Sequence, residues 1–169
     1  MNVGMYTGSF DPITRGHMDI IEQAKQVFDI VYIAVLNNLA KAKADKYVFT
    51  FDERVKMVND IYKNDPRIRV IANDYLTAAQ LAKDLHVNAF IRGLRNTIDF
   101  EYEKQMGYIN KRASDNYIPT VCFFSSPTYQ FVSSSVVREL MQYNPTKEQM
   151  NDYVYRTVWE QIEEKLKNK

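Results

Sequence analysis

The sequence has little that would fix a fold covalently or hold it in a membrane. Its 169 residues include a single cysteine, five glycines and five prolines. One cysteine cannot form an internal disulfide, which favours a reducing compartment. No segment has the length and apolar character of a membrane span, and no basic region followed by an apolar run marks a signal peptide. We therefore expect a cytoplasmic protein with no membrane partner.

An excess of charge of one sign is also absent. The chain has 22 lysine and arginine residues against 21 aspartate and glutamate residues, which gives a net charge of +1. This balance argues against a broad surface for nucleic acid, so no nucleic-acid partner is expected, but it allows a local basic site. With two histidines and one cysteine, a metal site made of protein side chains is not expected either.

What the sequence does contain is a globular composition in which short apolar runs alternate with helical patterns. Hydrophobic residues make up 46% of the chain and no repeat or linker divides it, so we expect one domain over residues 1–169. Strands are expected at 3–6, 30–36, 67–72, 88–92 and 118–124. Helices are expected at 17–28, 50–63, 76–85, 98–112 and 134–143, followed by a terminal helical region from 146 towards 165.

This alternation predicts right-handed crossovers and a parallel sheet. The expected fold is α/β and Rossmann-like, with five parallel strands, helices on both faces and a C-terminal helical region. Functional groups should then gather at the carboxyl ends of the strands. Two finer expectations follow from the apolar pattern. Val27 should lie on the buried face of the first helix, and Cys122 should be buried in the last strand.

The most informative stretch joins the first strand to the first helix. From Gly8 to His17 it has the sequence Gly-Ser-Phe-Asp-Pro-Ile-Thr-Arg-Gly-His. Thr14 can cap the helix, which places His17 in its first turn. Free backbone N–H groups and the positive end of the helix dipole converge there, so an anion is the expected ligand. The same dipole disfavours an imidazolium, so we expect a neutral His17 that donates a hydrogen bond unless phosphate raises its pKa.

The alternative is a glycine-containing turn with an incidental histidine. That interpretation would prevail for Thr14 to His17 taken alone, because four residues with one wildcard recur by chance. The stretch is neither a Walker loop nor a dinucleotide Gly-x-Gly-x-x-Gly motif. The complete ten-residue run at the first strand–helix junction favours a functional turn.

Two arginines and a glycine end the fourth predicted strand. Arg92 and Arg95 flank Gly93, and a guanidinium can bind phosphate oxygens in bidentate geometry. A polyphosphate is therefore the expected partner. The alternative is that both arginines pair with the acidic residues of the segment 99–103.

Two further groups give weaker signals. Three serines at 133–135 follow the fifth strand at the start of a helix, where they could bind phosphate or simply cap the helix. The loop at 37–49 holds lysines at 41, 43 and 46, and one of these could reach an anionic site.

Together these stretches resemble the phosphopantetheine adenylyltransferases of the nucleotidyltransferase superfamily. The resemblance covers nearly the whole chain, through the motifs at 8–17, 49–54 (Phe-Thr-x-x-Glu-Arg), 91–95, 99–103 and 133–135. It implies transfer of the adenylyl group of ATP to 4′-phosphopantetheine, which gives dephospho-coenzyme A and pyrophosphate. It also implies a homohexamer, with Mg²⁺ bound through the ATP phosphates.

The resemblance assigns roles to single residues as well. His17 would bind the α-phosphate and stabilise its transition state, while Lys41 and Arg92 would hold the acceptor phosphate. The phosphopantetheine contacts would be Ser9, Lys41, Thr77, Ala78 and Arg92. The ATP contacts would be Ser9, Phe10, His17, Gly93, Leu94, Arg95, Glu103, Tyr129, Gln130, Phe131, Val132, Ser133, Ser134 and Ser135.

Two segments depart from the family pattern. The loop at 37–49 is longer than usual, so Lys43 remains an alternative to Lys41. Around Thr77 and Ala78 the side chains are less apolar than in the family, which leaves the pantetheine contacts there open.

The implied reaction needs no protein nucleophile. The second pKa of a phosphomonoester is about 6, so the acceptor is already a nucleophilic dianion at neutral pH. The protein must hold two anions in line and neutralise the charge that grows on the α-phosphate and on the departing pyrophosphate.

Other functions stay open at this level. An enzyme that adenylylates nicotinamide mononucleotide would share the first motif, but the segments 92–95 and 99–103 favour the pantetheine enzyme. A nucleotide sensor without turnover could lose His17 freely, and a scaffold would not respond to ATP. A class I aminoacyl-tRNA synthetase is excluded by the chain length and by the missing Lys-Met-Ser-Lys-Ser loop.

Overall fold

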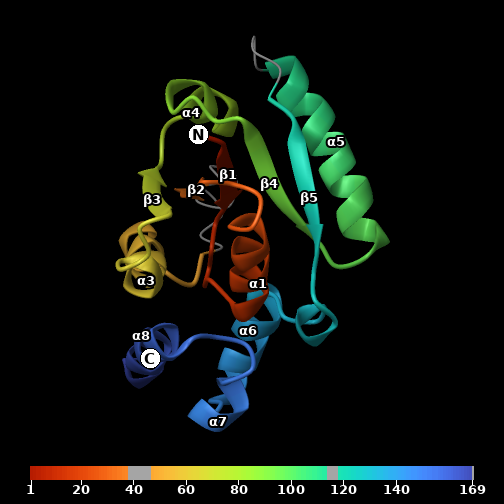
Figure 1. Ribbon diagram of the computed structural model, residues 1–169. Coiled ribbons are helices and arrows are strands. Elements are labelled where there is room, and N and C mark those ends of the chain that lie inside the picture. The colour runs from red at the N-terminus through yellow and green to blue at the C-terminus, as the bar shows by residue number, and fades with distance from the viewer. Residues whose placement is uncertain (38–46, 114–117, 169) are drawn as a thin grey trace.

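The computed structural model describes residues 1–37, 47–113 and 118–168, and its centre is a parallel sheet (Figure 1). The strands are β1 (Val3–Gly8), β2 (Ile30–Leu36), β3 (Ile68–Asn73), β4 (Ala89–Leu94) and β5 (Thr120–Phe124). They pair in the order β3-β2-β1-β4-β5, and every pairing is parallel. The predicted five-stranded parallel sheet is confirmed. Its order reverses between β1 and β4, which is where open parallel sheets form a ligand crevice.

Helices connect the strands and cover the sheet. They are α1 (Arg15–Ala24), α3 (Phe51–Tyr62), α4 (Ala78–Asp84), α5 (Thr97–Ala113), α6 (Ser134–Leu140), α7 (Lys147–Met150) and α8 (Arg156–Lys167), with the 3₁₀ turns η1 (Pro127–Tyr129) and η2 (Met141–Tyr143). Figure 1 shows α6, α7 and α8 gathered beyond one end of the sheet, and α5 running alongside β5. In the described part of the chain, no helix combines the length and apolar character needed to cross a membrane.

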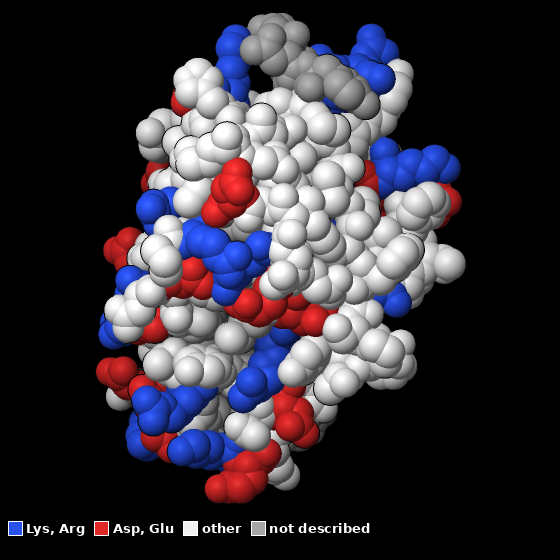
Figure 2. All heavy atoms as spheres, viewed as in Figure 1, with Lys and Arg blue, Asp and Glu red and all other residues white. Residues whose placement is uncertain are grey.

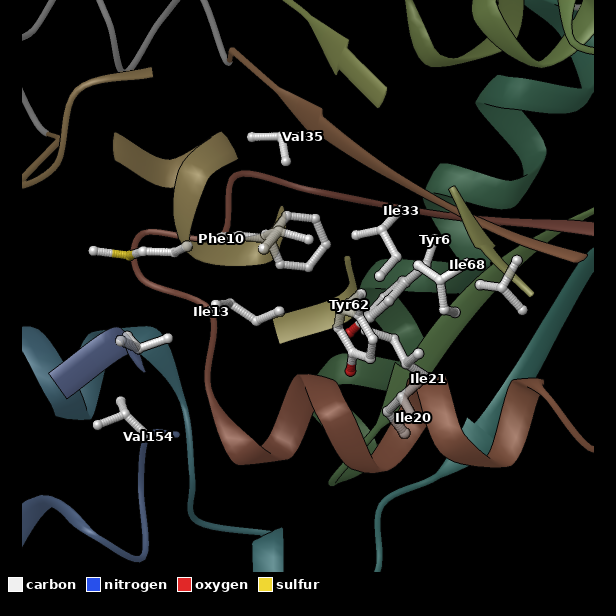
Figure 3. Packing of buried hydrophobic residues seen from close by; sticks show 14 of the residues in the cluster. Tyr6, Phe10, Ile13, Ile20, Ile21, Ile33, Val35, Tyr62, Ile68 and Val154 are labelled. Atoms are coloured by element: carbon white, nitrogen blue, oxygen red, sulfur yellow. The ribbon is translucent and has the colours of Figure 1, made fainter. Parts of the chain in front are cut away.

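The core is divided between the two faces of the sheet, because alternate strand residues point to opposite sides. Tyr6 and Ile33 belong to a buried cluster that also contains residues of α1, α3, α6 and α8. Met5 and Phe90 belong to a second cluster with residues of α4. Figure 3 shows Phe10 of the turn after β1 packed in the first cluster, near Ile13 and Val35. Helices therefore cover both faces, as the sequence predicts.

Threonine side chains start four of the helices. Each accepts the backbone N–H three residues further on, and the side chain at that third position accepts the threonine N–H in return. The pairs are Thr14 with His17, Thr50 with Glu53, Thr77 with Gln80, and Thr146 with Gln149. Three of these boxes use the usual Glu or Gln, whereas α1 uses a histidine.

Two expectations about burial are wrong. Val27 is 52% exposed because α1 ends at Ala24, so the helical period no longer places residue 27 on the buried face. Cys122 is exposed because its side chain lies on the face of β5 opposite to Val121 and Phe123, which pack against the first cluster, and it joins neither cluster of the core. Most boundaries differ by a few residues, and three differences are larger or divide an element. β4 continues through Gly93 to Leu94, the helical segment at 134–143 divides into α6 and η2, and the terminal region divides into α7 and α8.

Candidate active site

Three segments that are far apart in sequence meet at the carboxyl ends of β1, β4 and β5. They are the turn at 8–17, the segment 92–103 and the segment 125–138, and they enclose a cavity of about 340 Å³. Of the predicted site residues, those that line this cavity are Ser9, Phe10, His17, Arg92, Gly93, Arg95, Glu103, Val132, Ser133, Ser134 and Ser135. The imidazole and both guanidinium groups therefore share one cavity at the switch point of the sheet.

Other predicted residues lie elsewhere. Leu94 is buried, Phe131 is 79% exposed, and neither lines the cavity. Tyr129 and Gln130 belong to η1 and its end, outside the lining. Thr77 and Ala78 begin α4, where Thr77 serves as the N-cap. Lys41 and its alternative Lys43 fall outside the described residues.

His17 is held by the cap of its own helix. Its Nδ1 accepts the backbone N–H of Thr14 at 3.0 Å, and a backbone amide can only donate. The proton of the neutral ring is therefore on Nε2. Burial, and then the positive charge of Arg95, lower the pKa of His17 to about 4. The histidine is thus neutral and able to donate, as predicted, and desolvation is the largest cause of its lowered pKa.

Phe10 shapes the turn beneath the histidine. Its φ of 47° lies in the left-handed region, which is rare for an aromatic residue and typical of functional turns. The ring is 2% exposed and meets the His17 ring edge to face, with centroids 5.2 Å apart. It makes a similar contact with Tyr6 at 5.6 Å. These contacts stabilise a backbone conformation that an isolated chain would avoid.

The segment after β5 is tied directly to the same turn. The Ser134 hydroxyl donates to the Pro12 carbonyl at 2.7 Å, and Arg138 Nη1 donates to the Asp11 carbonyl at 2.7 Å. A Cβ added at Gly16 would lie 2.7 Å from the Val132 carbonyl oxygen, so only glycine allows this approach. The serine segment is consequently fixed against the turn that carries His17.

Both arginines line the cavity, and each already forms an ion pair with an acidic residue of α5. Arg92 donates to Glu103 at 2.9 Å and to both oxygens of Thr7 at 2.9 and 2.6 Å. Arg95 donates to both carboxylate oxygens of Asp99, at 2.8 and 3.1 Å. Pairing with the acidic segment, the alternative raised by the sequence, is therefore real. It does not remove the arginines from the cavity, because five N–H groups on each guanidinium exceed these contacts.

The carboxylates of these pairs differ in their environment. Burial raises the pKa of Glu103, although the positive charge of Arg92 opposes the shift. At Asp99 burial also raises the pKa, but the hydrogen bonds from Arg95 outweigh it and leave the pKa lowered. Both ion pairs hold a cation in a fixed orientation at the end of β4, before any ligand binds.

Sequence reasoning missed several lining residues. They are Tyr6, Thr7, Asp11, Ile20, Tyr102, Ser125 and Arg138, for which no role was predicted, and Asp99, which was expected only as an alternative partner of the arginines. For Arg138 a signal existed. It follows Ser134 by four residues and Ser135 by three, which places all three on one face of α6. Ser125 directly follows the strand predicted at 118–124, so its position at the carboxyl end of that strand was a signal too, whereas Ile20 shows only the pattern of an apolar helix residue.

Comparison with known proteins agrees with this geometry. Residues 5–140 match the cytidylyltransferase-like family. Phosphopantetheine adenylyltransferase of Lactobacillus acidophilus is 40% identical over 85% of this chain and 86% of its own length. That of Lactobacillus gasseri is 36% identical over 99% of this chain and 96% of its own. The chain belongs to the phosphopantetheine adenylyltransferases, within the cytidylyltransferase-like family.

Comparison with a solved structure shows similarity in fold only. Plasmodium falciparum nicotinic acid mononucleotide adenylyltransferase, solved in complex with NaAD, matches with a TM-score of 0.64 over 96% of this chain and 95% of its own. The sequence identity is 17%, so this likeness supports the Rossmann-like fold and says nothing of the acceptor. The predicted fold class is confirmed, and so is the predicted family.

The low pKa of His17 makes stability depend on pH in a defined direction. The folded pKa is about 4 and the ordinary value is 6.5, so the unfolded chain binds more protons between these values. The contribution of His17 is therefore complete above about pH 6.5 and is lost as the pH falls towards 4. Between pH 7 and pH 4.5, we expect the wild type to lose on the order of 1–2 kcal/mol more unfolding free energy than His17→Asn.

Urea unfolding at both pH values measures this difference. Asparagine is the matched replacement, because its Oδ1 can take the place of Nδ1 as acceptor of the Thr14 N–H and it does not titrate. Carboxylates titrate in both proteins, so their effect on the unfolding free energy cancels when the two losses are compared. Equal losses in the two proteins would show that His17 is not desolvated.

Proposed function

We propose that the protein transfers the adenylyl group of ATP to 4′-phosphopantetheine, giving dephospho-coenzyme A and pyrophosphate, as one domain over residues 1–169. The observation that carries the proposal is the single cavity in which a neutral histidine faces two paired arginines and three serines. The names of the relatives, phosphopantetheine adenylyltransferase, support the choice of acceptor.

In this proposal each side of the cavity takes one substrate. His17 donates from Nε2 to the α-phosphate of ATP, where negative charge grows in the transition state. Ser9 and Arg92 hold the acceptor phosphate. Arg95, Glu103 and the serine segment contact the remainder of ATP. The acceptor oxygen then attacks the α-phosphorus in line, the bond to pyrophosphate breaks, and no covalent bond to the protein forms.

Some assigned contacts remain predictions. We retain Lys41 as the lysine on the acceptor phosphate, with Lys43 as the alternative. Thr77 and Ala78 remain the proposed contacts of the pantetheine arm, which must extend beyond the cavity that holds its phosphate. Leu94 and the segment 129–131 remain proposed ATP contacts. The cytoplasmic location inferred from the single cysteine also stays a prediction.

Magnesium is proposed to enter with ATP. Among the described residues, no group of three or more His, Cys, Asp or Glu side chains is placed to hold a metal ion. The acidic groups of the cavity are engaged, because Asp99 and Glu103 pair with arginines and Asp11 accepts the N–H groups of Val48 and Phe49. Bound through the ATP phosphates, Mg²⁺ supplies charge neutralisation of the triphosphate.

A direct assay tests the activity. Protein, ATP, Mg²⁺ and 4′-phosphopantetheine should yield dephospho-coenzyme A and pyrophosphate, whereas nicotinamide mononucleotide should yield little pyrophosphate.

In the same assay, His17→Asn should lower kcat by roughly two to three orders of magnitude, because it removes the donor to the α-phosphate and keeps the helix cap. Binding of both substrates without product would indicate a sensor, and near-normal turnover by His17→Asn would remove its catalytic role.

We further propose that the protein is a homohexamer. Large apolar side chains are exposed on α5 and β5, among them Ile98 at 78%, Tyr108 at 61% and Phe124 at 79%. Figure 2 shows a broad area without charge on this face of the molecule, above a region of intermixed acidic and basic residues. Sedimentation equilibrium should give the mass of six chains. A monomer at micromolar concentration would contradict the proposal.

A further inference from the structure

Arg54 of α3 is the most deeply buried charged side chain in the described part of the chain. It is 1% exposed, and no carboxylate of the described residues forms an ion pair with it. It belongs to the motif at 49–54, for which neither the cavity lining nor the proposed reaction supplies a role. A buried arginine of this kind needs a physical explanation.

The guanidinium joins three parts of the chain. Nη1 donates to the Ser9 carbonyl at 2.6 Å and to the Leu36 carbonyl at 3.1 Å. Nη2 donates to Asn37 Oδ1 at 2.6 Å. The Tyr47 ring covers the group, with its centroid 4.1 Å from Cζ. The turn after β1, the end of β2 and the start of α3 are therefore fixed to one planar group.

Stability alone does not account for an arginine here. Burial lowers its pKa, while the nearby Tyr47 and Asp11 raise it, and a guanidinium keeps its charge throughout. A buried charge costs free energy unless it is paired, and no carboxylate among the described residues forms an ion pair with Arg54. What an apolar side chain cannot do is donate to the Ser9 and Leu36 carbonyls at the same time.

Ser9 lines the cavity, whereas Arg54 lies one hydrogen bond behind it. The same turn has a second anchor to this region. The Asp11 carboxylate accepts the N–H groups of Val48 and Phe49 at 3.1 and 2.9 Å, immediately before α3. With Arg54 on one side and Asp11 on the other, the backbone at Ser9 has little freedom to rotate.

We propose that Arg54 is a positioning residue for the acceptor side of the cavity, which fixes the orientation of Ser9 towards the phosphate of the acceptor. The inference rests on the proposed function and deepens it. Arg54 touches neither substrate, and it acts by holding the Ser9 carbonyl. Its loss should therefore affect the acceptor more than ATP. Ser9 and Phe10 are also proposed ATP contacts, but the other proposed ATP contacts, among them His17, Arg95 and Glu103, accept no hydrogen bond from Arg54.

Steady-state kinetics of Arg54→Met, with each substrate varied in turn, test the inference. We expect the KM for 4′-phosphopantetheine to rise about tenfold or more and the KM for ATP to change by less than about threefold. The matched control is Met57→Ala on the same helix. Met57 is fully buried and its side chain has no donor for the Ser9 carbonyl, so this variant should lose stability while both KM values stay near those of the wild type.

Several results would overturn the inference. Unchanged KM values in folded Arg54→Met, or the same change in both variants, would reduce Arg54 to a structural residue. If Arg54→Met does not fold, Arg54→Lys takes its place. Lysine keeps the charge but has no fork to join the Ser9 carbonyl and the Asn37 side chain, so the same selective rise is expected. A wild type that makes no dephospho-coenzyme A would overturn the proposed function as well, whereas an active wild type with unaffected variants refutes only the role of Arg54.

Discussion

The close contact between the turn after β1 and the segment after β5 is the interaction on which the site depends. Gly16 allows its backbone to approach the Val132 carbonyl, and Ser134 and Arg138 donate to carbonyls of the turn. β1 and β5 are separated in the sheet by β4. This contact, together with the hydrogen bonds that Asp19 of α1 accepts from the Ser126 N–H and hydroxyl at 2.8 and 2.6 Å, holds the serine segment beside the turn that carries His17. A side chain at position 16 would open the cavity along this line.

Within the cavity, the charges are arranged before a ligand arrives. The arginines are oriented by Asp99 and Glu103, and His17 is neutral because it is desolvated and lies near Arg95. A neutral donor costs less to bury than an imidazolium and is kept in a single tautomer by the Thr14 amide. Groups fixed in this way stabilise developing negative charge without having to reorganise during the reaction. This explains how a chain with a net charge of +1 can still serve two polyanionic substrates.

The sequence predicted the sheet, the cap of α1 at Thr14 and the meeting of His17 with the arginines, because these depend on local patterns and on strand ends. The sequence did not predict the burial of side chains whose surroundings depend on which elements pack together. Cys122 is exposed because the core does not cover its face of β5, and the residues of the strand do not determine which of its two faces is covered. Arg54 has the charge of a surface residue, and only the packing of three segments around it makes it buried. The choice between pairing and phosphate binding was likewise open, since the arginines can do both.

The central claim is that one cavity holds both substrates so that the acceptor attacks the α-phosphorus directly. The most direct test uses ATP with a single sulfur substitution of defined chirality at the α-phosphorus, and determines the configuration in the thiophosphate product. One in-line displacement predicts inversion. Retention would require two displacements through a bond to the protein, and it would contradict the account.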